Sequence, residues 1–140
     1  MKVEFLIPKL SFLTPGKTLF LNYMPDNIIH GLVILPSLMG GKIDPYVPNF
    51  KVADTFQIVS RDTDLVSSRD RALQASEALS VTLPENLKAA SINQSSWKDI
   101  CIVSCRPLQE PIVFPRPLDG AWESSVNFSI NWYELDQDDA

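Results

Sequence analysis

The stretch Phe56-Gln57-Ile58-Val59-Ser60-Arg61-Asp62 predicts a β-strand, and the pattern of a helix follows it directly over residues 65–83. Side chains alternate along a strand, so Phe56 and Ile58 lie on one face while Gln57, Val59 and Arg61 lie on the other. Only the first face is wholly apolar, which indicates that it belongs to the core. We expect the rest of the chain to be arranged around this strand and this helix.

The predicted helix has a start signal and a stop signal. Asp62, Thr63 and Asp64 each carry a side-chain oxygen that can cap a first turn, so any of the three can be the N-cap. Pro84 disfavours helical geometry at the preceding residue and therefore predicts an end at Leu83. Small alanines in the apolar stripe allow the helix to lie close to a sheet. The stripe consists of Leu65, Ala72, Ala75, Leu79 and Leu83.

Three further segments predict strands. Residues 28–35 form an apolar run that His30 interrupts, as in a buried strand. Residues 97–106 predict a central strand, and residues 126–133 alternate apolar and polar. The sequence thus predicts an α/β (α+β) fold, a single domain over residues 1–140 with a small mixed β-sheet of about four or more strands against an amphipathic helix. In the segment 97–106, Ile100 and Ile102 share one face, and the other face carries Cys101, Val103 and Cys105. In the last segment, the face expected in the core carries Val126, Phe128, Ile130 and Trp132.

Composition indicates ordinary soluble globular material. The chain has 140 residues, of which 45% are apolar and 21% charged, which is enough to bury roughly two-thirds of the unfolded surface in one core. No apolar run approaches the roughly 18 to 20 residues of a membrane span, so we expect no membrane partner. The first eight residues lack a secretory signal pattern, which makes the cytoplasm the default location.

The net charge of -5 is concentrated at the C-terminus. Four of the 17 acidic residues lie in the tail 134–140, so the remainder carries 13 acidic and 12 basic residues. This balance argues against a general nucleic-acid binder, which needs a surplus of Lys and Arg to displace counterions from phosphates. The tail is expected to be a solvated end, or alternatively a surface that repels DNA or meets a basic partner.

The residue types that carry chemistry are few and dispersed. Cys101 and Cys105 would share a strand face about 13 Å apart, which is too far for a disulfide, and their spacing fits neither zinc nor redox sites. His30 has no ligand partner at a suitable spacing. Capping explains Asp62 and Asp64 better than a catalytic carboxylate pair does. We therefore expect no catalytic residues, no cofactor, no metal and no enzymatic activity.

Two segments keep apolar residues without a clear period. Residues 36–54 predict a long loop, which either makes contacts or covers its own core edge. Prolines 107, 111, 115 and 117 predict that residues 107–120 form an extended arm or an open hairpin that projects from the sheet. Both segments are candidates for contacts with partners. The candidate interface residues are Met39, Ile43, Tyr46, Phe50, Ile112, Phe114 and Arg116.

Residues 18–134 resemble the tail-terminator, or tail-completion (minor capsid), proteins of long-tailed bacteriophages. A longer N-terminal helix would be expected in that family. Here residues 1–17 are compatible with a strand or with a short helix that Pro8 and Pro15 would cut. The resemblance is carried by Phe20 with Tyr23-Met24-Pro25, by residues 32–35, by residues 56–64 followed by Arg71-Ala72 and Leu83, and by Asn127-Phe128-Ser129-Ile130 followed by Tyr133.

The resemblance implies a structural virion protein without catalysis. Its subunits would form a homohexameric ring on the last tail-tube ring, end tail polymerisation and join the tail to the neck or connector. Partners would then be other copies, the tail tube protein and neck proteins, with genomic DNA only in transit through the lumen. The protein would reside in the virion, and in the host cytoplasm during assembly.

Two alternatives stay open at this point. The chain could be another neck component, such as a head-closure or adaptor protein. It could instead be a small binding module or an enzyme accessory subunit that uses residues 36–54 as its ligand site. Such a module would be a monomer or dimer with a concave pocket.

Overall fold

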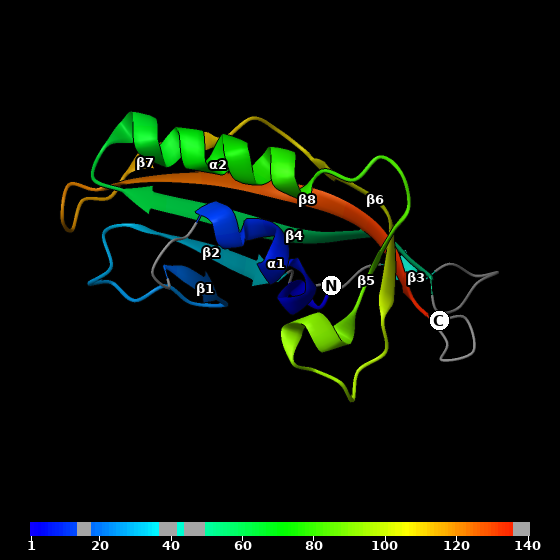
Figure 1. The fold of residues 1–140 in the computed structure, drawn as a ribbon. Helices are drawn as coiled ribbons and strands as arrows, with labels where there is room; N and C mark the ends of the chain where they lie inside the picture. The colour runs from blue at the N-terminus through cyan, green and yellow to red at the C-terminus, as the bar shows by residue number, and fades with distance from the viewer. Residues whose placement is uncertain (14–17, 37–41, 44–49, 136–140) are drawn as a thin grey trace.

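A computed structural model of the chain describes residues 1–13, 18–36, 42–43 and 50–135. It contains one sheet of eight strands with helical segments against it (Figure 1), which confirms the predicted fold class. The helical segments are η1 (Val3–Leu6), α1 (Ile7–Leu10), η2 (Ser11–Leu13), α2 (Leu65–Leu79) and η3 (Ala89–Ile92). The strands are β1 (Leu19–Leu21), β2 (Gly31–Pro36), β3 (Lys42–Ile43), β4 (Phe50–Asp62), β5 (Glu85–Leu87), β6 (Ile100–Pro107), β7 (Ile112–Pro115) and β8 (Trp122–Glu134).

Strands β4 and β8 form the centre of the sheet. Each has 13 residues, and they pair antiparallel from Phe50 opposite Tyr133 to Asp62 opposite Trp122. The strand order is β1-β2-β4-β8-β6-β5, with β3 paired to β4 and β7 paired to β8. Strand β6 is interior, as the sequence predicts, and β4 contains the predicted strand 56–62 with an extension at its N-terminal end.

One face of the central pair carries the core. Phe56 and Phe128 stack with ring centroids 4.8 Å apart, and helix α2 packs over this face with Ala72, Ala75 and Leu79 fully buried. These contacts confirm which face of the strand 56–62 and which face of the helix were predicted to lie in the core. Three polar groups at the same interface satisfy one another, because Ser68 Oγ donates to the Ser60 carbonyl at 2.9 Å and lies 2.9 Å from Ser124 Oγ.

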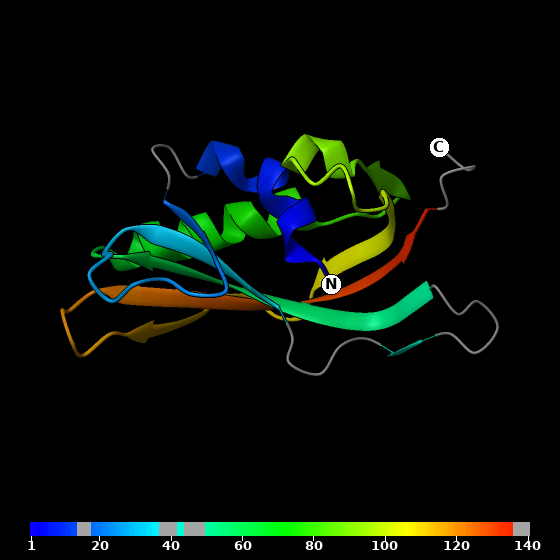
Figure 2. The same ribbon diagram turned by 90° about the horizontal axis from the view of Figure 1, so that it is seen from below.

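The N-terminal segment adds to the helical layer. It folds as short helical turns whose apolar side chains Val3, Phe5, Leu6 and Leu10 are buried in the core. Pro8 lies in the first turn of α1, where its missing N–H costs no hydrogen bond. Figure 2 shows this segment, η3 and α2 on the same side of the sheet. Among the described residues, no helix combines the length and apolar character needed to cross a membrane.

Helix α2 begins at the expected place but ends earlier than predicted. Asp64 is the N-cap, and its carboxylate accepts from the Ser67 backbone N–H at 3.0 Å. The helix ends at Leu79, because the backbone of Val81 exchanges two 2.9 Å hydrogen bonds with Cys105 of β6. Leu83 is 78% exposed and lies outside the core. A tertiary contact therefore ends the helix before the signal of Pro84 is reached.

The prediction of one long loop over residues 36–54 was wrong for the residues that the structure describes. Residues 42–43 form β3, and residues 50–54 belong to β4. A register shift lies between Lys51 and Asp54, where Ala53 has a φ of 53° and donates its N–H to Asn131 Oδ1 at 2.8 Å. This β-bulge interrupts the period of two, so the sequence shows no alternation there. Figure 1 shows β3 and the start of β4 beyond the end of α2.

The proline-rich segment is a hairpin within the sheet. Strand β7 pairs antiparallel with the first residues of β8, from Ile112 opposite Ser125 to Pro115 opposite Trp122. The predicted hairpin and the exclusion of a central strand are therefore confirmed, whereas the expectation that this segment projects from the sheet was wrong. Prolines are tolerated here because β7 lies at a margin of the sheet, where one side needs no ladder hydrogen bonds.

Both cysteines are buried, as predicted, but they face opposite sides of β6. A register shift between Ile102 and Ser104 inserts one extra residue, so Cys105 joins Ile100 and Ile102 in the core, whereas Cys101 does not. Burial raises the pKa of the Cys105 thiol to about 12. This thiol is therefore protonated and unreactive at neutral pH.

Truncation of the helix stripe tests this packing. Leu79→Ala should lower the free energy of unfolding by roughly 2 to 5 kcal/mol, because it leaves a cavity at a fully buried site. Leu83→Ala and Gln74→Ala are matched controls on exposed side chains and should change it by less than about 0.5 kcal/mol. Urea unfolding followed by circular dichroism measures all three. A loss at Leu83 equal to that at Leu79 would contradict the early helix end.

Candidate interaction surface

The face of the sheet opposite α2 carries no helix among the described residues (Figure 2). The alternation along β4 and β8 places small uncharged polar side chains at the middle of this open face. Apolar side chains flank them, with Leu35 of β2 at one side and Ile112 and Phe114 of β7 at the other. The central side chains are Thr55, Gln57, Ser125, Asn127 and Ser129.

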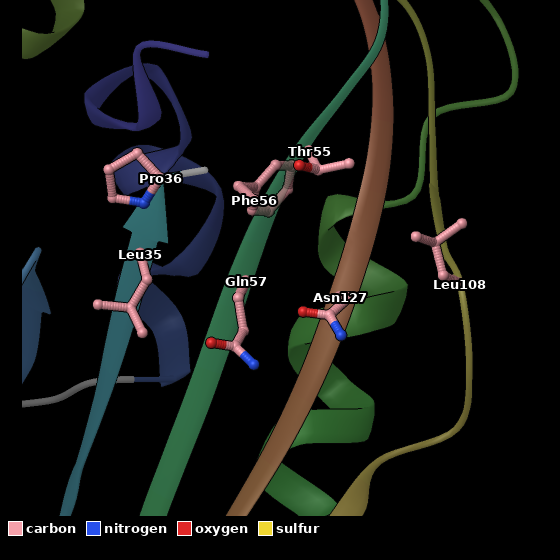
Figure 3. A pocket seen from close by; sticks show the side chains of 7 residues that line it. All are labelled: Leu35, Pro36, Thr55, Phe56, Gln57, Leu108 and Asn127. Atoms are coloured by element: carbon pink, nitrogen blue, oxygen red, sulfur yellow. The ribbon is translucent and has the colours of Figure 1, made fainter. Parts of the chain in front are cut away.

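A shallow groove of about 330 Å³ lies on the open face. Gln57 and Asn127 stand opposite each other in its floor, with Leu35 on one side and Leu108 on the other (Figure 3). Neither amide has a hydrogen-bond partner among the described residues. Two free amides between apolar walls can bind the backbone N–H and C=O groups of an extended peptide.

Charged side chains gather at one end of the sheet and hold the loop 22–30 in place. Arg61 is 6% exposed and donates to Glu123 Oε2 at 3.1 and 3.2 Å. It also donates to the carbonyl oxygens of Pro25 and Ile28, each at 2.9 Å. All three guanidinium nitrogens thus donate in contacts that join the loop to the ends of β4 and β8.

Asp62 has several partners from distant parts of the chain. Its Oδ2 accepts from Arg71 at 2.8 Å and lies 3.3 Å from His30 Nδ1, while Oδ1 accepts from the Asp64 backbone N–H at 3.0 Å. Burial disfavours the charged carboxylate, but these hydrogen bonds outweigh it, so the pKa of Asp62 lies below its ordinary value. The role of Asp62 as a helix-start residue was predicted in part, and its contact with His30 was not.

The predicted interface residues have four different outcomes. Ile112 and Phe114 are 54% and 39% exposed on β7, and Phe50 lies half-buried against the Tyr133 ring. Arg116 is buried and pairs with Asp26 and Asp119 at 3.0 Å. Both terminal nitrogens of its guanidinium are therefore engaged within the subunit, where they stabilise the fold. Ile43 lies in β3 opposite Lys51. Met39 and Tyr46 lie outside the described residues.

Sequence reasoning missed other parts of this surface. Leu108 and Leu118 are 49% and 72% exposed, and their position among prolines was a signal that could have found them. Gln57 and Asn127 come together only through the register of β4 and β8. Among the described residues, no group of His, Cys, Asp and Glu is placed to hold a metal ion.

Comparisons with known proteins find a likeness among solved structures. No family model and no curated protein matches the chain. Among solved structures, it is similar to a chain in the virion of a native gene transfer agent particle. The TM-score is 0.56 at 12% sequence identity, over 89% of this chain and 84% of that chain. The two chains share a fold. At this identity the likeness carries no further statement about activity.

Acid titration tests the Asp62 cluster. The pKa of Asp62 is lower folded than unfolded, so its contribution to stability is complete above the unfolded value of about 3.9 and is lost as the pH falls through the folded value. Asp62→Asn should therefore destabilise the protein at neutral pH, by roughly 1 to 3 kcal/mol. The difference from wild type should shrink below about pH 4.

Urea unfolding at a series of pH values measures this difference. Asp70→Asn is a control on an exposed carboxylate of helix α2 and should have little effect at any pH. A difference between wild type and Asp62→Asn that stayed constant across the acid range would show that the charge of Asp62 plays no part.

Proposed function

We propose that this chain is a structural protein of a phage-like virion particle. More specifically, we propose that it caps the tail tube as a ring, ends tail polymerisation and joins the tail to the neck or connector proteins. The observation that carries the proposal is the shared fold with a chain of the gene transfer agent virion, which extends over most of both chains. The resemblance of residues 18–134 to tail-terminator proteins supports the more specific role.

The distribution of exposed apolar residues supports an assembly role. Ile112, Phe114 and Leu118 lie within one short hairpin and are between 39% and 72% exposed. The groove beside Gln57 and Asn127 lies on the same open face of the sheet. A subunit of a ring needs at least two different contact surfaces, one for each neighbour. The β7–β8 hairpin and the open face of the sheet can serve as these two contact surfaces, and neither role requires a catalytic group.

The proposal includes no catalysis, cofactor or metal. Three buried charged side chains pair with more exposed partners in contacts that hold the fold: Arg61 with Glu123, Asp62 with Arg71, and Arg116 with Asp26. Charges engaged in this way serve to position loops at the end of the sheet.

DNA enters the proposal only as a molecule in transit. Lysine or arginine side chains lining a lumen would hold phosphates and slow passage, so a conduit is better served by neutral or acidic walls. Six copies with a net charge of -5 each would carry about -30. The uncharged middle of the open face is compatible with either a protein contact or a conduit wall.

The groove favours a second candidate function. Free amides between apolar walls suit a small peptide-binding module, which would be a monomer or dimer in solution. A head-closure or adaptor protein is a third possibility within the virion class. The position of the chain in a particle separates all of these.

Electron microscopy of purified particles tests the proposed position. We expect copies of the chain as a ring at the head-proximal end of the tail tube. Density at the portal side of the neck would instead assign an adaptor or head-closure role. Absence of the chain from intact particles would refute the virion proposal and favour the binding module.

A gel shift tests the role of DNA. The isolated protein should show no affinity for double-stranded DNA that weakens as salt is raised, because its body is nearly neutral and its tail is acidic. A basic DNA-binding protein in the same gel serves as the positive control. Tight binding at low salt that falls steeply with added salt would show a protein that grips DNA.

A further inference from the structure

Strands β1 and β7 form two opposite margins of the same half of the sheet (Figure 1). A single row of paired residues crosses the sheet from one margin to the other. It runs from Leu19 through Leu32, Ser60 and Ser124 to Val113. Among the described residues, β1 pairs only with β2 and β7 pairs only with β8. Both margins therefore present an unpaired backbone side at the same level of the sheet.

Neither margin has the charges that usually protect a sheet edge. Strand β1 reads Leu-Phe-Leu and β7 reads Ile-Val-Phe-Pro. Edge strands of monomeric proteins commonly carry lysine or other charged residues, which prevent pairing with another chain. The edge strand β5 follows that rule, because it carries Glu85, which pairs with Lys9 at 2.8 Å. The apolar composition of β1 and β7 indicates that another strand covers them.

The hydrogen bonds of β1 define which groups it offers. Leu32 N–H donates to the Thr18 carbonyl at 3.0 Å, and Asn22 N–H donates to the Ile34 carbonyl at 2.9 Å. Because alternate residues of a strand bond to opposite sides, Leu19 and Leu21 direct their backbone groups away from β2. The Leu21 carbonyl already accepts from Tyr23 N–H at 2.8 Å. The outer side of β1 thus offers the N–H and C=O of Leu19 and the N–H of Leu21.

The hydrogen bonds of β7 define a complementary set. Arg116 N–H donates to the Ala121 carbonyl of the hairpin at 2.7 Å, so Ile112 and Phe114 bond to β8 by the same alternation. Val113 therefore directs its N–H and C=O outward. Pro111 and Pro115 are each two residues from Val113, so their backbone groups also point outward. They offer carbonyl groups but no N–H.

We propose that β7 of one copy pairs antiparallel with β1 of the next copy, with Val113 opposite Leu19. Within one sheet β7 runs antiparallel to β1, so copies placed side by side in one orientation bring these strands together antiparallel. Val113 and Leu19 then exchange two hydrogen bonds, and Leu21 N–H donates to the Pro111 carbonyl. Pro111 has no N–H to donate to the Leu21 carbonyl. No hydrogen bond is lost there, because this carbonyl already accepts from Tyr23 N–H.

The alternative register with Val113 opposite Leu21 is worse matched. Val113 N–H would face a carbonyl that is already engaged by Tyr23. The proposed register also aligns the side chains. Ile112 stands directly opposite Phe20 on the open face, while Val113 and Leu19 meet on the helix side. A side chain of the neighbouring copy then covers Ile112, which is 54% exposed in the single subunit.

This contact joins two different surfaces and therefore propagates from copy to copy. Such head-to-tail contacts close into a ring if the rotation between copies closes, and otherwise give an open chain. The closed ring rests on the proposed function, whereas the strand pairing rests on the two edges alone. The partner of the two edges is thus a second copy of this chain.

A cross-link tests the register. The double variant Phe20→Cys, Ile112→Cys places a cysteine on each of the two facing edges. Residue 20 of one copy and residue 112 of its neighbour would form a non-hydrogen-bonded pair with Cα atoms about 4.5 Å apart, which is within disulfide range. Within one copy the two sites are four strand spacings, roughly 19 Å, apart and cannot react. After mild oxidation we expect covalent multimers on non-reducing gels. The matched control, Phe20→Cys with Phe114→Cys, is two residues out of register and should cross-link at least about tenfold less.

Edge charges give an independent measurement. Ile112→Lys should reduce the assembly to monomer by light scattering, whereas Leu118→Lys, at an exposed turn residue outside the edge, should leave it intact. Circular dichroism confirms that each variant is folded. Wild-type protein, whose Cys101 and Cys105 are buried, should give no covalent multimers.

The outcomes separate the strand pairing from the proposed function. Rings in the microscope without cross-links at Phe20 and Ile112 would overturn the strand pairing and leave the virion role intact. Cross-linked open chains would support the pairing and count against a closed ring. Monomers that do not cross-link would overturn the pairing, while particle microscopy would still decide the virion role separately.

Discussion

The antiparallel pairing of β4 with β8 is the interaction on which the rest of the structure depends. All the other strands reach the sheet through one of these two or through a strand that pairs with them. Helix α2 packs across both, and its small buried residues Ala72 and Ala75 allow a close approach to Phe56 and Phe128. Loss of this pairing would remove the surface against which α2 buries its apolar side chains.

Two β-bulges adapt this long ladder to its surroundings. At Ala53 the bulge lets β4 continue beyond the helical layer and pair with β3, while Asn131 satisfies the displaced backbone N–H. At Val103 the bulge turns Cys105 into the core. Each bulge reverses which side chains face the core. The layer of helices on one face and the open opposite face follow from this arrangement.

Uncharged sheet margins are unusual for a protein that functions alone, because an unprotected edge strand can pair with another chain. The buried pairs around Arg61 and Arg116 hold the loop 22–30 and the β7–β8 hairpin at the end of the sheet. These contacts keep β1 and β7 at the same level. A rigid subunit with matched edges needs little rearrangement to join a neighbour.

Local pattern in the sequence was sufficient for the strands at 56–62 and 126–133, for the helix from Leu65 and its buried stripe to Leu79, and for the exposed Ile112 and Phe114. Period and capping are properties of neighbouring residues, so they can be read without a fold. Contacts between distant residues decided the rest. The Val81 bridge to Cys105 ended the helix, the bulge at Ala53 hid the strand at 50–54, and ion pairs with Asp26 and Asp119 engaged the Arg116 guanidinium. Only strand register, which long-range pairing sets, could align Leu19 with Val113 and Gln57 with Asn127.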